Sequence, residues 1–387
     1  MEHVGVLIAD VHWGVMSDKQ LRFELDEIFI NYISSLKRLD FIVILGDWFD
    51  HKLYLNTQSA NSAIYYMDKI ISIARAKGAK IRVVYGTESH ECSQYDVFST
   101  YETKSEYDFK VIKTVSSEEL FPDMKVLYIP EEHITDKKDY YNDYFKDNHY
   151  NYIFGHGVIQ EVMTTAVKHT EKVQKKLKVP VFTSKELTKI ADDVYFGHYH
   201  IHTDIEPFCH YIGSFSRWQF GQEEDKGFYL VKCNPKKHEW YSEFIVNHLA
   251  ERYITKLYNV NDDIFKSQEN LVKECNKADI MIRDNLTEHL RLIINIPDGF
   301  SNETLYTDFL KERFSSNPKI KVVINSRGIK QDEEDEQAEL NMIDDKYSYL
   351  FDNTSIEEQI RLFILNEYGT TLDREKVKFY LTRNERN

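Results

Sequence analysis

Three alternating histidines follow an apolar run in residues 194–204, which read VYFGHYHIHTD. They are His198, His200 and His202. Because every second side chain of a β-strand points to the same face, an extended segment here would turn all three imidazoles the same way. Neutral imidazole is the commonest metal ligand near neutral pH, so the pattern suits a metal site. A solvated strand edge suits it equally well, and the choice depends on the rest of the chain.

Four further apolar runs also end in Asp or His. Their ends read Asp10-Val11-His12, Gly46-Asp47-Trp48-Phe49-Asp50-His51, Gly86-Thr87-Glu88-Ser89-His90-Glu91 and Gly155-His156-Gly157. In open α/β sheets, ligands bind beyond the carboxyl ends of the strands, so this recurrence indicates one shared site. The glycines let the backbone turn sharply or approach closely before each ligand. Mixed carboxylate and imidazole ligands suit Mn, Fe or Zn better than Ca or Mg.

The runs that carry these residues alternate with helical patterns over the first 245 residues. We expect strands at 4–10, 41–47, 80–86, 124–130, 151–157, 194–198, 210–215 and 226–233, and helices at 24–39 and 59–77. Continuous apolar strands separated by helices predict an α/β layered fold with helices over buried sheets.

A smaller unit is expected over residues 250–326. Its predicted order is strand 252–260, helix 263–275, strand 290–296, helix 303–314 and strand 320–326, with a topology that the sequence does not fix. Residues 332–345 then carry eight carboxylates and no Lys or Arg, which is typical of a solvated acidic linker.

Two short amphipathic helices are expected after this linker. Ser355 and Glu358 match a capping box at the start of the first. The apolar stripe of that helix consists of Ile356, Ile360, Phe363 and Ile364. The stripe could pack on the body of the protein or dock on a partner, and the sequence leaves both open.

Composition limits the classes of function. No apolar run is long enough to span a membrane, and the first residues, MEHVGVLIADVHWG, read as a strand rather than a signal peptide. Four cysteines without a C-x-x-C spacing indicate a reducing, cytoplasmic setting. The net charge of −15 weighs against strong unaided binding to DNA. Five lysines between 168 and 178 could hold a phosphate backbone or form a solvated face.

The ordered motifs resemble those of the calcineurin-like metallophosphoesterases, and most closely the SbcD-type DNA exonucleases, the nuclease subunits of SbcC–SbcD complexes. The resemblance covers residues 4–233, and the segments 213–217 and 223–228 also resemble that subgroup. The length and the third motif suggest a phage-encoded version. The resemblance implies a two-sheet nuclease core over 1–248, an α+β capping domain that binds DNA over 249–328, the acidic linker at 329–350, and helices for a partner ATPase at 351–387.

The resemblance also assigns roles to the motif residues. Asp10, His12 and His200 would hold one divalent ion, His156 and His198 the second, and Asp47 would bridge the two. His90 would protonate or stabilise the leaving alkoxide, and Asp50 would orient a ligand imidazole. The ions would be Mn, with Fe, Zn or Mg as alternatives. His51, His133, His202 and His210 match no ligand position and are expected to be solvated or hydrogen-bonded.

The third motif departs from the family. Its usual form is Gly-Asn-His-Asp, and the Asn is a ligand of the second ion. Counted back from His90, Ser89 takes the Asn position and two residues are inserted after Gly86. Thr87, Glu88 or a water could fill the place instead. We therefore expect weaker binding of the second ion.

The predicted function is a two-metal DNA nuclease, a 3′-to-5′ exonuclease with endonuclease activity. It would work with an SbcC-like ABC-type ATPase in DNA repair, recombination or replication, and a homodimer is also considered. One alternative is a metallophosphoesterase acting on nucleotides or phosphoproteins. The other is a degenerate, non-catalytic adaptor that loads an ATPase onto DNA, which the altered third motif would favour.

Overall fold

The computed structural model describes residues 2–134, 136–162, 179–259, 263–284, 286–296, 303–314 and 317–325. These residues belong to one compact unit, Met1–Ser326. The lysine cluster at 168–178, the acidic segment and the terminal helices lie outside the described residues. The domain boundaries at 248 and 328 stay predictions.

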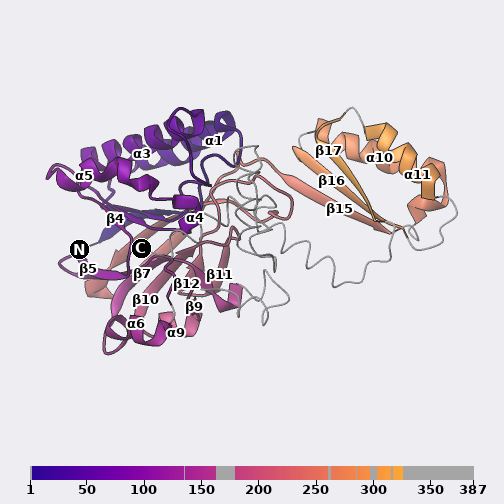
Figure 1. Cartoon of the computed structure of the whole chain (residues 1–387). Coiled ribbons are helices and arrows are strands. Elements are labelled where there is room, and N and C mark those ends of the chain that lie inside the picture. Colours follow the sequence, from indigo (N-terminus) through magenta and orange to yellow (C-terminus); the bar gives the residue numbers. More distant parts are fainter. Residues whose placement is uncertain are drawn as a thin grey trace, which may run out of the picture. The chain divides into compact units, whose positions relative to one another are not determined.

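The first of two six-stranded sheets contains the N-terminal strand (Figure 1). In spatial order its strands are β14 (Glu239–Val246), β13 (Gly227–Asn234), β1 (His3–Ile8), β2 (Phe41–Leu45), β3 (Lys80–Val84) and β4 (Phe109–Ile112). Strands β1 to β4 are parallel, whereas β13 and β14 add an antiparallel hairpin. The carboxyl ends of β1, β2 and β3 therefore lie at the same edge.

The second six-stranded sheet has a similar organisation. Its order is β11 (Thr203–Glu206), β12 (Cys209–Tyr211), β10 (Ala191–Gly197), β7 (Tyr150–His156), β6 (Met124–Ile129) and β5 (Ser116–Phe121). The four central strands are parallel and the two edge strands are antiparallel. Strands β6, β7 and β10 thus also end at one edge.

The two sheets pack face to face. One buried cluster joins Leu7 and Val43 of the first sheet to Tyr152, Phe154 and Tyr195 of the second. Side chains alternate along a strand, so the neighbours of these residues point to the opposite faces, where the helices lie.

Helices cover both outer faces. The consecutive segments α1 (Asp18–Glu24), η1 (Leu25–Ile30) and α2 (Asn31–Ser35), together with α3 (Gln58–Lys77), pack on the first sheet. On the second lie α6 (Lys137–Phe145) and α9 (Ser184–Thr188). Sequence explains the limits of α3, because Thr57 accepts a hydrogen bond from the N–H of Ala60 and Gly78 ends the helix at a φ of 69°. The predicted α/β fold of two layered sheets with helices outside is confirmed.

Shorter elements connect these layers. They are α4 (Glu88–Glu91), η2 (Gln94–Phe98), α5 (Ser99–Thr103), η3 (Pro235–Lys237) and the strand pair β8 (Val158–Ile159) and β9 (Val181–Phe182). Several predicted bounds were wrong, among them those of one helix and one strand. The helix predicted at 24–39 spans 18–35, and the strand predicted at 210–215 stops at 211 because Gly213 turns at a φ of 74°.

Residues 253–325 form the three-stranded sheet β15 (Tyr253–Asn259), β16 (His289–Asn295) and β17 (Ile320–Asn325). Its strands are parallel, and η4 (Asp263–Lys266), α10 (Gln268–Arg283) and α11 (Glu303–Phe314) connect them. Leu271, Leu292 and Leu310 belong to its own buried cluster. The topology that the sequence left open is therefore a parallel alternation of strands and helices. No described helix has the length and apolar character needed to cross a bilayer.

Candidate metal centre

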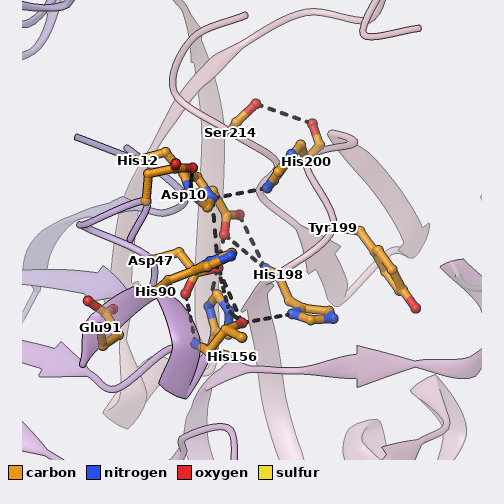
Figure 2. A network of polar contacts seen from close by, with 12 residues as sticks. Asp10, His12, Asp47, His90, Glu91, His156, His198, Tyr199, His200 and Ser214 are labelled. Carbon is orange, nitrogen blue, oxygen red and sulfur yellow. Dashed lines mark hydrogen bonds and ion pairs between the residues drawn. The ribbon is translucent and has the colours of Figure 1, made fainter. Parts of the chain in front are cut away.

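The seven predicted site residues meet where the carboxyl ends of the two sheets come together. Asp10 and His12 follow β1, Asp47 follows β2, His90 lies on α4 after β3, His156 ends β7, and His198 and His200 follow β10. Figure 2 shows these side chains pointing toward one another. They form three overlapping groups that could hold metal ions, namely Asp10–His12–His200, His12–Asp47–His90 and Asp47–His156–His198.

Asp47 belongs to the second and third of these groups, and His12 to the first and second. Oδ2 of Asp47 lies 2.9 Å from Nδ1 of His90, 3.3 Å from Nε2 of His156 and 3.7 Å from Nε2 of His12. The side chain is fully buried. One carboxylate that faces ligands from both sheets has the position required of a bridge between two ions.

The first group is organised around two imidazoles. Nε2 of His12 lies 3.0 Å from Nε2 of His200. Nδ1 of His12 lies 3.1 Å from Oδ1 of Asp50, whose carboxylate fixes the tautomer and leaves Nε2 available. Asp50 thus makes the contact expected of a residue that orients a ligand. Asp10, which is fully buried, completes the group.

The second group is organised around His156. Its Nδ1 donates to the carbonyl of Leu45 at 2.7 Å, so Nε2 is free to face Asp47. A Cβ on Gly46 would lie 2.2 Å from His156 Nδ1, and the φ of Gly46 is 78°. Glycine is therefore required here for both space and backbone conformation.

In the third motif, the residue that faces the centre is not the one that the alignment to His90 favoured. Ser89, placed at the Asn position by counting back from His90, is exposed, and so is Glu88. Thr87 is the residue of this stretch that contacts Asp47: its hydroxyl lies 3.3 Å from Oδ2 of Asp47, and its N–H donates to Oδ1 at 2.7 Å. The inserted residues form the short helix α4, which carries His90.

Glu131 is a site residue that the motif series missed. It follows β6, and its Oε2 lies 3.0 Å from Nδ1 of His198 and 3.4 Å from the hydroxyl of Thr87. Only 6% of its side chain is exposed. The sequence did contain a signal for Glu131, because this residue also follows an apolar run, at 124–130. It lies outside the five motifs quoted above.

The electrostatics of the centre favour positive charge. Burial opposes the charged form of His156, yet Asp47 with Asp10 raises its pKa to about 10. Burial raises the pKa of Asp10 to about 6. Burial acts the same way on Glu131, but His198 holds its pKa below the ordinary value. Within the described residues, the ion pairs of these three carboxylates all go to histidine and none to Lys or Arg.

Backbone conformation marks the same residues. Four predicted ligands have φ in the left-handed region, namely Asp10 at 49°, His12 at 53°, Asp47 at 49° and His198 at 117°. Such conformations are costly for residues with a Cβ and concentrate at functional sites. Lys226 donates to the backbone carbonyl of His200, but among the described residues no Lys or Arg forms an ion pair with Asp10, Asp47 or Glu131. Buried oxygen and nitrogen atoms arranged in this way are well suited to divalent cations.

The expectation that three histidines share one side of a strand was wrong. Strand β10 ends at Gly197, so all three follow the strand in a turn. His198 and His200 face the centre, whereas His202 stacks on Phe244 at a ring distance of 3.6 Å and contacts the hydroxyl of Tyr229. His202 therefore lies outside the ligand pair, as its lack of a motif match predicted.

Comparisons with known proteins do not identify a family. No family model matches the sequence, and no curated protein matches it. Among the solved structures that are similar, one crystal structure matches over 63% of this chain and 100% of its own, at 14% identity and a TM-score of 0.31. Likeness at this level carries no argument about activity. What the structure shows is a two-sheet α/β protein with buried His/Asp clusters that could bind metal ions.

Proposed function

We propose that this chain is a metal-dependent phosphodiesterase that uses two divalent ions, preferably Mn, to hydrolyse DNA. The observation that carries the proposal is the position of Asp47, whose Oδ2 faces histidines from both sheets. A fully buried carboxylate shared by two groups of ligands is an expensive arrangement unless cations neutralise it. The two-ion, two-sheet phosphoesterases that the motif order resembles have this arrangement.

The residues divide into holding and reacting groups. Asp10, His12 and His200 would hold the first ion, His156 and His198 the second, and Asp47 both. When bound, such a pair supplies a water of lowered pKa and stabilises the charge on the phosphate oxygens. The carbonyl of Leu45 fixes the ring of His156, just as Asp50 fixes that of His12.

We assign His90 the role of assisting the leaving group. Its side chain is 31% exposed, whereas those of His12 and Asp47 are each 1% exposed. It is also more exposed than His198, whose side chain is 21% exposed, and its Nδ1 contacts Asp47 at 2.9 Å. A half-buried imidazole at the edge of the centre can donate a proton to the alkoxide released from the phosphodiester.

Three parts of the proposal depend on the motif resemblance. They are DNA as the substrate, 3′-to-5′ polarity with endonuclease activity, and an SbcC-like ATPase partner in repair, recombination or replication. Because the net charge of the chain is negative, bound metal ions or a partner would have to supply much of the attraction for the DNA backbone.

The test is a substrate panel with purified full-length chain. We expect Mn-dependent cleavage of end-labelled single-stranded DNA, with products shortening from the 3′ end, and no cleavage in EDTA. Hydrolysis of nucleotides or phosphopeptides without cleavage of DNA would favour the phosphoesterase alternative. Binding of the ATPase without hydrolysis of any phosphoester would favour the adaptor.

A further inference from the structure

The hydroxyl of Thr87 lies at the centre of a set of metal-ligand atoms. It is 3.3 Å from Oδ2 of Asp47, 3.5 Å from Nε2 of His156, 3.4 Å from Nδ1 of His198 and 3.4 Å from Oε2 of Glu131. A hydroxyl has one proton to donate, so it cannot satisfy four such neighbours by hydrogen bonding. A cation shared among them would satisfy all of them at once.

Two of these neighbours are buried carboxylates. Asp47 and Glu131 come from different sheets, and their side chains are 1% and 6% exposed. Within the described residues, their ion pairs go to His12, His90, His156 and His198 only. Buried carboxylates need a cation or hydrogen-bond donors. The N–H of Thr87 donates to Oδ1 of Asp47, but imidazoles that serve as metal ligands supply neither to Oδ2 of Asp47 or to Glu131.

The contact between Glu131 and His198 has the spacing of two ligands of one metal ion. The nitrogen of His198 nearest Glu131 is Nδ1, and the same nitrogen faces the hydroxyl of Thr87. Neighbouring ligands of one ion, each bound at about 2.1 Å, lie roughly 3 Å apart. The 3.0 Å between Oε2 of Glu131 and Nδ1 of His198 has that size.

We propose that Glu131 is a direct ligand of the second ion, with the hydroxyl of Thr87 beside it, so that a carboxylate from the second sheet replaces the amide that the family's third motif provides. The inference depends on the proposed two-ion centre and names a ligand that the motifs do not contain. The second ion then has two carboxylates in its ligand set, Asp47 and Glu131. The altered third motif would therefore not weaken the second site, contrary to the expectation from the sequence.

Metal binding, rather than activity, tests this assignment. Metal-free full-length protein would be titrated with Mn²⁺ by calorimetry, and free Mn²⁺ counted by electron paramagnetic resonance. The variants are Glu131→Ala, which removes the carboxylate, and Glu131→Gln, which keeps its shape. Glu88→Ala is the control, because Glu88 is an exposed carboxylate that directly follows Thr87, at the start of α4.

We expect two Mn²⁺ for the wild type and for Glu88→Ala. Glu131→Ala should keep the first ion and bind the second more than 100-fold more weakly, beyond the about 10–100-fold loss usual when a residue only orients a ligand. Glu131→Gln should fall between, since an amide oxygen can still coordinate. Thermal unfolding without metal would show whether each variant is folded. If Glu131→Ala is not folded, the Mn²⁺ affinity of Glu131→Gln decides the assignment.

The anomalous signal of Mn in crystals of the wild type locates the ion directly. We expect a peak at bonding distance, about 2.2 Å, from Oε2 of Glu131. Wild-type affinity of the second ion in both Glu131 variants, or an ion out of bonding reach of Glu131, would overturn the assignment. A wild-type protein that binds fewer than two ions would instead contradict the two-ion centre, so the two failures are distinguishable.

Discussion

The Nε2 atoms of His12 and His200 face each other at 3.0 Å, although these residues are 188 positions apart in the chain. His12 comes from the edge of the first sheet and His200 from the edge of the second, so their approach joins the two halves of the centre. Burial, together with His12, lowers the pKa of His200 well below its ordinary value. The lowered pKa keeps the ring of His200 uncharged, which is the form of imidazole that can bind a metal ion.

Replacing His90 separates chemistry from metal binding. His90→Ala should leave two Mn²⁺ bound and lower the turnover of DNA cleavage by about 10²–10⁴-fold, the usual range for general acid–base assistance. The measurements are metal content and single-turnover rate on the same preparation. Loss of Mn²⁺ from this variant would show that His90 is a ligand, a role that its grouping with His12 and Asp47 also permits.

The role of Asp50 can be separated from that of its neighbour His51. Oδ1 of Asp50 contacts His12 at 3.1 Å, and Oδ2 contacts the half-exposed His51 at 3.0 Å. Asp50→Ala should weaken Mn²⁺ binding at the first site by about 10–100-fold, the cost typical of a lost orienting residue. His51→Ala, the control, should bind Mn²⁺ like the wild type. Equal losses in both variants would mean that the loop, rather than the Asp50–His12 contact, matters.

A buried histidine away from the centre should make stability depend on pH. His210 lies 2.6 Å from Oδ1 of Asp204 and 3.3 Å from Oδ1 of Asp193. Burial opposes its charged form, but these carboxylates raise its pKa above the ordinary value of 6.5. The folded-state pKa is the higher one, so the stabilisation is fully present below about pH 6.5 and is lost as pH rises through the raised pKa.

Urea unfolding at several pH values measures this effect. The difference in free energy of unfolding between the wild type and His210→Gln should be largest in mildly acidic solution and shrink as the pH becomes alkaline. A difference that is constant with pH, or that grows toward alkaline pH, would show that His210 is neutral in the folded protein.

The terminal segment gives a prediction from sequence alone. Truncation after Arg327 should leave Mn-dependent cleavage of short single-stranded DNA nearly unchanged, because the described ligands all precede it. It should abolish co-elution with an SbcC-like ATPase, since the apolar stripe from Ile356 to Ile364 follows an acidic segment and is suited to a partner's groove. Size-exclusion chromatography of co-expressed chains tests this. A truncated chain that still co-elutes would place the contact elsewhere.

The sequence was sufficient for the parts of the fold and site that depend on local pattern. Apolar runs such as 41–47 and 151–157 identified central strands, because strands buried on both faces have near-continuous apolar sequence. Asp47 and His156 could be identified because each lies at or just beyond the end of such a run. Strand β1 stops two residues before Asp10, since left-handed backbone cannot continue a strand.

The parts that the sequence left open depend on features that local pattern does not encode. Counting back from His90 aligned Ser89 with the Asn position, with Thr87, Glu88 or a water as alternatives, because the residues of a helical turn separate His90 from Gly86. Thr87 would have been found by counting forward from Gly86. Glu131 could not be assigned because its significance lies in a contact with His198, 67 residues later, which follows β10, on the other side of β7 from β6.

The number of Mn²⁺ ions bound per chain by the wild type and by Asp47→Ala tests the central claim most directly. Asp47 would serve both ions, so equilibrium dialysis should give two ions for the wild type. The variant should fold but bind at most one, weakly, and should not cleave DNA. Fewer than two ions on the wild type, or two ions retained by Asp47→Ala, would contradict a centre bridged by this carboxylate.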